Sequence, residues 1–205
     1  VRENNAAMTQ PAIVKTRDDA YRLLVEYTTN DSLIKHALAV EAALRWYARK
    51  YGEDELLWGI TGLLHDFDYE RFPEISETGH PFMGCKELER QGYPPIMIEA
   101  ILGHATYSGV ERRSLLAKVL FACDELAGLI TAAVYVRPDR SVHTLNAQSV
   151  MKKMKDKAFA RAVNREDIRC GAEELGVDLV EHITNVIDAM RHNAEALGLG
   201  GAVVA

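Results

Sequence analysis

Apolar residues recur at helical spacing along the whole chain. Leu33, Ala37, Val40, Leu44 and Tyr47, for example, form one apolar stripe, because positions three and four residues apart share a face of an α-helix. The sequence has no comparable run of alternating, β-branched residues between turn signals, which would predict a strand. The pattern therefore predicts an all-α fold. The expected helices span residues 18–27, 32–51, 54–65, 81–91, 95–104, 112–136, 147–161, 165–175 and 178–197.

Glycine and proline residues mark the ends of these helices. Gly52, Gly92 and Gly176 follow predicted helix C-termini, and Pro81 and Pro95 suit the first turn of the next helix. No internal repeat, low-complexity segment or linker divides the sequence. We therefore expect a single helical domain over residues 11–197, with a flexible leader at 1–10 and a flexible tail at 198–205.

The composition is that of an ordinary globular chain, with 48% of the 205 residues hydrophobic and 26% charged. The 30 acidic residues outnumber the 24 basic ones and give a net charge of −6, which argues against nonspecific nucleic-acid binding. Cys85, Cys123 and Cys170 lack CxxC spacing and are interpreted as reduced thiols. The longest uncharged apolar stretch, 126–136, is too short to span a bilayer. We expect a cytoplasmic protein with no membrane partner.

Several polar residues interrupt the apolar stripes or stand at helix ends. His36 lies on the flank of its stripe, and His104 continues the inward face of the helix at 95–104. The adjacent pair His65-Asp66 ends the helix at 54–65, where two side chains can be aimed at one centre. His80 is held between Gly79 and Pro81 at the expected start of the next helix.

Asp124 is the strongest of these candidates, because its helical neighbours are small or apolar. A carboxylate in such surroundings must be neutralised, paired with a cation or bound to a metal. Any one of these residues has an ordinary explanation, such as a hydrogen-bonded core histidine or an Asp–Arg pair. Together they supply the nitrogen and oxygen ligands that borderline divalent metals prefer, and we predict a metal site. His143, His182 and His192 have no partner at ligand spacing, which indicates structural or solvent-facing roles.

The residues around these positions carry a family resemblance. His36 within residues 35–40, His65-Asp66 within 62–68 and Asp124 within 122–126 together resemble the HD-domain superfamily of metal-dependent phosphohydrolases, whose pattern is a His, a His-Asp pair and a distant Asp. The resemblance covers most of residues 20–195. Gly79-His80-Pro81 and the stretch 149–160 are similar to the HDIG-related branch, although Phe67-Asp68 stands where its Ile-Gly would follow. The resemblance to the HD-domain superfamily implies a single-domain HD-type multi-helix bundle that encloses a metal site.

The resemblance also implies a set of metal ligands. His80 and His104 lie between the His-Asp pair and the last Asp, as they do in two-metal members of the superfamily. We therefore expect two divalent ions, drawn from Mn, Fe, Zn, Ni, Co or Mg. The expected ligands are His36, His65 and Asp124 for one ion and His80 and His104 for the other. Asp66 would bridge the two ions and is the expected catalytic residue.

The predicted activity is hydrolysis of a phosphoester, mono- or diester, by metal-activated water. The expected partner is a small phosphorylated substrate such as a nucleotide. Lys152 and Lys155 lie one turn apart and off the i, i+4 run from Lys153 to Arg169, which is typical of a solvated helix face. We predict that Lys152 and Lys155 bind the substrate phosphate.

Two other functions fit the same residues. A few HD-fold enzymes use a similar set of four His and two Asp to hold a di-iron centre that cleaves C–C or C–P bonds with oxygen. A non-catalytic binding module stabilised by metal is the third possibility, since structural metal sites tend to have no open coordination position.

Overall fold

A computed structural model describes residues 15–201, and over this range the fold is all-helical, as the pattern predicts. The elements are α1 (Arg17–Tyr27), α2 (Asp31–Tyr51), α3 (Glu55–Leu64), α4 (Phe82–Arg90), α5 (Pro95–His104), the 3₁₀ turn η1 (Thr106–Ser108), α6 (Leu115–Tyr135), α7 (Ala147–Lys155), α8 (Arg165–Leu175), α9 (Leu179–Arg191) and α10 (Ala194–Leu197). Within residues 15–201, strand-like pairing is confined to one antiparallel bridge between Ser141 and Gly200.

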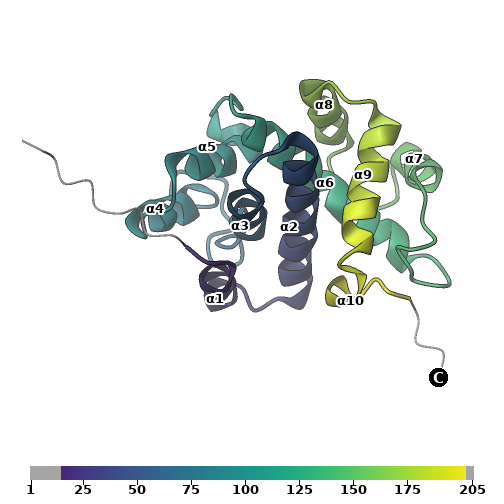
Figure 1. Ribbon diagram of the computed structural model, residues 1–205, viewed down its shortest axis with the longest axis horizontal. Helices are drawn as coiled ribbons and strands as arrows, with labels where there is room; N and C mark the ends of the chain where they lie inside the picture. The colour runs from purple at the N-terminus through teal and green to yellow at the C-terminus, as the bar shows by residue number, and fades with distance from the viewer. Residues whose placement is uncertain (1–14, 202–205) are drawn as a thin grey trace, which may run out of the picture.

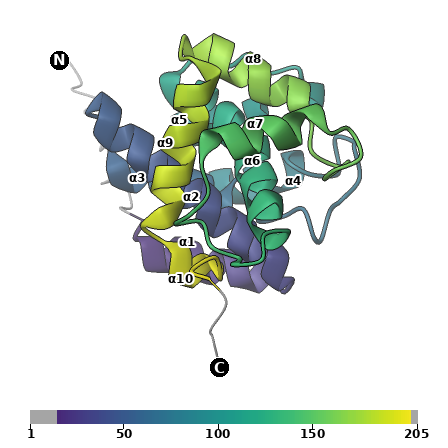
Figure 2. The ribbon, with the colours of Figure 1, turned by 90° about the vertical axis from the view of Figure 1, so that its right-hand side faces the viewer.

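The two longest helices, α2 and α6, are 21 residues each and pack against each other at the centre of the molecule. Helices α1, α3, α4 and α5 lie on one side of α2, and α7 to α10 lie on the other (Figure 1). Viewed from the second side, α7, α8 and α9 lie together on one face (Figure 2). Helix α6 packs against α5 from the first group and against α8 from the second. A residue on α6 can therefore meet residues from the N-terminal helices.

Short polar side chains begin most helices and glycines end several of them. Asn30 and Asp54 accept hydrogen bonds from the first backbone N–H groups of α2 and α3. Gly52 and Gly176 end α2 and α8 with φ of 73° and 65°, a left-handed conformation that favours glycine. Both positions were predicted as helix ends, and both are confirmed.

Three predicted helix boundaries are wrong. The helix expected over 147–161 ends at Lys155, because Asp156 takes an extended conformation and its carboxylate accepts the N–H groups of Ala158 and Phe159. The helix expected over 178–197 is two helices, α9 and α10, separated at residues 192–193. The helix expected from residue 112 begins at Leu115, after its N-cap Ser114.

The C-terminal segment expected to be a flexible tail is packed at its start. Leu199 is buried, and its carbonyl accepts the backbone N–H of Val142 at 2.9 Å. The start of this segment therefore packs on the helical domain, and the flexibility of the tail stays a prediction. The rest of the expected tail at 202–205 and the expected leader at 1–10 lie outside the described residues.

A buried polar link joins three helices in the core. The hydroxyl of Tyr47 on α2 donates to Nδ1 of His182 on α9 at 2.5 Å, and Nε2 of His182 donates to the carbonyl of Ala122 on α6 at 2.8 Å. Burial lowers the pKa of His182 and keeps the ring neutral, which this pattern of one acceptor and one donor nitrogen requires. His182 therefore has the structural role predicted for it.

None of the helices among residues 15–201 combines the length and the apolar character that crossing a lipid bilayer requires.

The contact between α6 and α8 depends on a glycine. A Cβ at Gly171 would lie 2.5 Å from the Cα of Ala122, whereas a Cβ at Gly128 would meet only a methyl group of Val163 at 4.0 Å. We expect Gly171→Ala to lower the free energy of unfolding by about 1–3 kcal/mol through overpacking. The matched variant Gly128→Ala should leave it unchanged or raise it by up to about 1 kcal/mol. Urea denaturation measures both, and a Gly171→Ala protein as stable as the original would contradict this account of the interface.

Candidate metal centre

The six predicted ligands come together although they lie on five different segments. His36 is on α2, His65-Asp66 ends α3, His80 precedes α4, His104 is the last residue of α5, and Asp124 is on α6. Their nitrogen and oxygen atoms form two groups, each with all atoms within 4.8 Å of one another. The first group is His36, His65, Asp66 and Asp124, and the second is Asp66, His80 and His104.

Asp66 belongs to both groups and presents a different oxygen to each. Its Oδ2 lies 3.3 Å from Nε2 of His65 and 3.9 Å from Nε2 of His36. Its Oδ1 lies 3.3 Å from Nε2 of His80 and 3.2 Å from Nε2 of His104. This is the geometry of a carboxylate that can bridge two cations.

Asp124 completes the first group from the side of α6. Its Oδ1 lies 2.9 Å from Nε2 of His36 and 3.4 Å from Nε2 of His65. The approach of α2 to α3 requires a glycine, because a Cβ at Gly62 would lie 2.9 Å from the carbonyl oxygen of Val40. Gly62 is three residues before His65 and Val40 is four residues after His36, so this contact brings the two histidines together.

Hydrogen bonds on the outer side of three imidazoles fix which nitrogen faces the centre. Nδ1 of His65 donates to the carbonyl of Gly62 at 2.8 Å, and Nδ1 of His104 donates to the carbonyl of Ile101 at 2.5 Å. The Nδ1 of His80 donates to a carboxylate oxygen of Asp68 at 2.7 Å. Because Nδ1 makes the outer hydrogen bond, Nε2 of each ring is the nitrogen that faces the group and that can offer a lone pair to a cation.

One buried atom tests whether a cation fits here. Nε2 of His65 is fully buried and has no hydrogen-bond partner within the described structure. A buried polar atom without a partner is costly, and a lone pair facing two carboxylates is repelled unless a proton or a metal ion lies between them. The donor set of imidazole nitrogens and carboxylate oxygens suits divalent ions such as Zn²⁺, Mn²⁺ or Fe²⁺. The residues present therefore fit a metal ion.

The charges in the group agree with this interpretation. Burial alone would raise the pKa of Asp66, but the nearby His65 and His104 outweigh it and hold this pKa well below its ordinary value. Burial likewise opposes protonation of His65, yet the carboxylates of Asp66 and Asp124 raise its pKa well above the usual one. Within residues 15–201 neither carboxylate forms an ion pair with a lysine or an arginine. The group thus attracts positive charge that the described side chains do not supply.

The centre is closed on one side and open on the other. The side chains of His65, His80 and His104 are at most 7% exposed, whereas those of His36, Asp66 and Asp124 are 20–22% exposed. An ion held at this centre would therefore contact buried histidines on one side and would be open to solvent on the side of His36, Asp66 and Asp124. Catalytic metal sites keep such an open position, whereas structural sites are coordinatively closed.

Sequence reasoning missed Asp68, which supports His80 from behind. Asp68 is buried, and its second carboxylate oxygen accepts the backbone N–H of Gly84 at 2.7 Å. A Cβ at residue 84 would lie 2.6 Å from the carboxyl carbon of Asp68, so only glycine fits there. The sequence hint to this role is that Asp68 lies two residues after Asp66. Asp68 follows the end of α3, however, and outside a helix no periodicity shows which way a side chain points.

Glu125 was also missed, although it is adjacent to Asp124. Burial, followed by the negative charge of Asp124, raises the pKa of Glu125 to about 7. Its Oε2 accepts the backbone N–H of Asn164 at 3.1 Å. Glu125 therefore ties the loop between α7 and α8 to helix α6 beside the candidate metal centre.

Two half-exposed tyrosines border the second group. The hydroxyl of Tyr107 donates to the backbone carbonyl of His80 at 2.5 Å, and the ring of Tyr69 meets the ring of His80 edge-on with centroids 5.5 Å apart. Each tyrosine is 44% exposed. They give the surface next to His80 an aromatic border.

The two lysines predicted to bind substrate lie outside both ligand groups. Lys152 lines a separate cavity, and Lys155 is exposed at the C-terminal end of α7. Arg112 is bound to Glu174 and to the carbonyl of Gly103. The substrate-binding role of Lys152 and Lys155 stays a prediction.

Comparison with known proteins agrees with this geometry. Residues 33–129 match the family model described as HD domain, a range that contains all six candidate ligands. Ribonuclease Y of Acholeplasma laidlawii is 28% identical over 125 residues, which is 59% of this chain. The match covers 23% of the length of that protein. No solved structure is significantly similar to this chain.

The contact between Asp68 and His80 gives a testable expectation. An amide has one oxygen and one N–H₂ group, so Asp68→Asn must place a donor against the N–H of either His80 or Gly84, and this disturbs the support of the His80 ring. We expect binding of Mn²⁺ at His80 and His104 to weaken about 10- to 100-fold, as measured by calorimetric titration of metal-depleted protein. The control is Glu77→Gln, which removes an exposed carboxylate from the same connection and should leave the affinity unchanged. Unaltered Mn²⁺ binding by a folded Asp68→Asn protein would show that His80 needs no such support.

Proposed function

We propose that this chain, whose residues 33–129 match the family model described as HD domain, is a metal-dependent phosphohydrolase that cleaves the phosphoester of a small phosphorylated molecule, such as a nucleotide. HD domains are typically metal-dependent phosphohydrolases. The observation that carries the proposal is the position of Asp66, whose two carboxylate oxygens each face a separate pair of histidines. The name ribonuclease of the relative from Acholeplasma also denotes cleavage of a phosphoester bond.

The proposal assigns each ligand a role. His36, His65 and Asp124 would hold one divalent ion, His80 and His104 would hold a second, and Asp66 would contact both. Such ions lower the pKa of bound water toward about 7 and stabilise the charge on phosphoryl oxygens. The hydrogen bonds made by Nδ1 of the buried histidines turn their Nε2 atoms toward the centre, while the exposed edges of His36, Asp66 and Asp124 leave room for substrate.

The two buried thiols of the chain do not offer a competing nucleophile. Cys85 and Cys123 are buried, and burial raises the pKa of each thiol far above neutrality. A thiol that stays protonated is a poor nucleophile. Hydrolysis by water therefore fits these residues better than covalent catalysis by cysteine.

The small size of the proposed substrate rests on charge. The chain carries a net charge of −6, which disfavours long polyanions. Two divalent ions within the centre would attract a single phosphate group in spite of that overall charge.

Metal dependence is the first test. Dialysis against a chelator should abolish hydrolysis of p-nitrophenyl phosphate, bis(p-nitrophenyl) phosphate and nucleoside monophosphates, and added Mn²⁺, Co²⁺ or Zn²⁺ should restore it. Asp66→Ala should lower kcat/KM about 1000-fold or more, because it removes a ligand of both ions. His192→Ala, an exposed histidine outside the centre, should have no effect. Full activity of Asp66→Ala would refute the assignment, and iron-dependent oxygen consumption without hydrolysis would identify an oxygenase instead.

Lys155 is the second test of the proposed activity. If it contacts the substrate phosphate, Lys155→Ala should raise KM about 10-fold with little change in kcat, because a charge-assisted hydrogen bond to the bound substrate is lost. Lys157→Ala removes an equal charge from the neighbouring loop and serves as the control. An unchanged KM for Lys155→Ala would show that this lysine does not touch substrate.

A further inference from the structure

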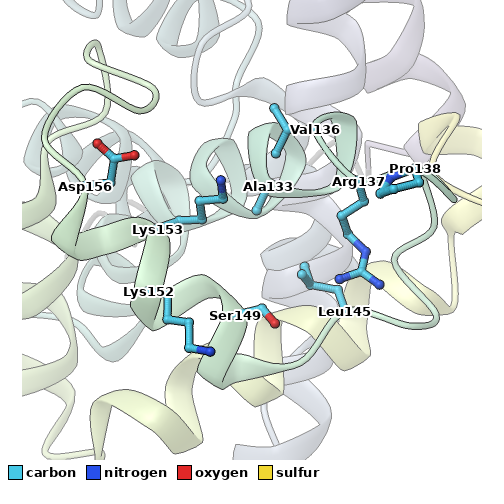
Figure 3. Close-up of a pocket in the computed structure, with 9 residues that line it drawn as sticks. All are labelled: Ala133, Val136, Arg137, Pro138, Leu145, Ser149, Lys152, Lys153 and Asp156. Carbon is cyan, nitrogen blue, oxygen red and sulfur yellow. The ribbon is translucent and has the colours of Figure 1, made fainter.

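A cavity of about 430 Å³ lies between the C-terminal end of α6, the connection that follows it and helix α7 (Figure 3). Its lining residues are Ala133, Val136, Arg137, Pro138, Leu145, Ser149, Lys152, Lys153 and Asp156. None of the six candidate metal ligands is among them. Its volume falls within the range of small-molecule sites.

The cavity is separated from the candidate metal centre by helix α6. Ala133 follows Asp124 by nine residues on this helix. At 1.5 Å and 100° per residue, that spacing is about 13 Å along the axis and about half a turn around it. The metal centre and the cavity therefore use opposite sides of the same helix.

The charges around the cavity favour an anion. Figure 3 shows Arg137 at the end of α6 and Lys152 and Lys153 on α7, on two sides of the space. Within residues 15–201 neither lysine forms an ion pair with a carboxylate, although Lys153 lies over the ring of Phe159 at 4.6 Å. Two ammonium groups are therefore available to a ligand.

Two acidic residues near the cavity, Asp156 and Asp139, offset part but not all of the charge of the three basic residues. The Oδ1 atom of Asp156 accepts the backbone N–H groups of Ala158 and Phe159 at 3.0 and 3.3 Å. Asp139 pairs with Arg137 at 3.1 Å and offsets part of its charge. The cavity thus keeps an excess of positive charge on a chain whose net charge is negative.

One wall of the cavity is apolar. Ala133 and Leu145 are buried at its base, and Val136 at its rim is 56% exposed. Pro138 adds a second apolar surface at the same end. An exposed valine next to unpaired cations is suited to a ligand that has both a charged group and an apolar part.

We propose that this cavity is a second small-molecule site, distinct from the metal centre, and that it binds an organic phosphate monoester. The ammonium groups of Lys152 and Lys153 bind the phosphate, and Val136, Pro138 and Leu145 contact the apolar part. Under this proposal, the phosphate that Lys152 is predicted to bind lies in this cavity. The proposal does not depend on what reaction the metal centre performs.

The test uses phenylphosphonate, a dianion with an aromatic ring and no phosphoester bond to hydrolyse. Protein labelled at Ala, Val and Leu methyl groups is titrated and followed by NMR, with Ala133, Val136 and Leu145 reporting on the cavity and Ala37 on the metal centre beside His36. We expect saturable shifts at the cavity methyl groups. The double variant Lys152→Ala/Lys153→Ala should weaken this binding about 10-fold or more. Val136→Asp, which places a carboxylate at an exposed position, should abolish it.

The control variant Lys157→Ala/Arg161→Ala removes two charges from exposed positions of the same basic segment and should change the affinity by less than about two-fold. Inorganic phosphate, which lacks the ring, should bind at least about 10-fold more weakly than phenylphosphonate. Equal weakening by both double variants, shifts confined to Ala37, or equal affinity for the two probes would each overturn the proposal. Loss of phosphoester hydrolysis would not, because the binding is read at the cavity itself.

Discussion

The structure depends on the confinement of two carboxylates, Asp66 and Asp124, among four imidazole nitrogens at the meeting point of five segments. Within the described residues these carboxylates have no lysine or arginine partner. Such an arrangement is costly unless positive charge is added. The outer hydrogen bonds of His65, His80 and His104 direct their Nε2 atoms inward. Several buried contacts therefore serve to point ligand atoms at one small volume.

Close helix contacts make this confinement possible. Gly62 allows α3 to approach the backbone of α2, and Gly84 leaves space for the carboxylate of Asp68. On the far side, Gly171 allows α8 to lie against α6 at Ala122, two residues before Asp124. Glycines therefore occupy the contacts that hold the ligand-bearing helices in position. The close packing that results suits a centre whose ligand atoms are fixed in place.

Much of this could be predicted from the sequence, for identifiable reasons. The apolar periodicity located the helices, and His36, His104 and Asp124 stood out because they are polar residues on or beside apolar faces. Asp68 could not be found in that way, because it lies in irregular structure after α3 and its role depends on the distant Gly84. The cavity beside Lys152 depends on the early end of α7 at Asp156, where a side chain competes for the backbone N–H groups. Residues 192–193 separate α9 from α10 with no proline or glycine to mark the break.

The shared carboxylate of Asp66 has a thermodynamic consequence. If each of its oxygens binds a cation, as proposed above, a cation on one oxygen would withdraw electron density from the other, so occupancy of one histidine pair would alter the affinity of the second. Linkage requires this influence to be reciprocal. A half-loaded protein would then be a distinct chemical species, whose abundance would depend on how strongly the two sites are coupled as well as on the supply of metal.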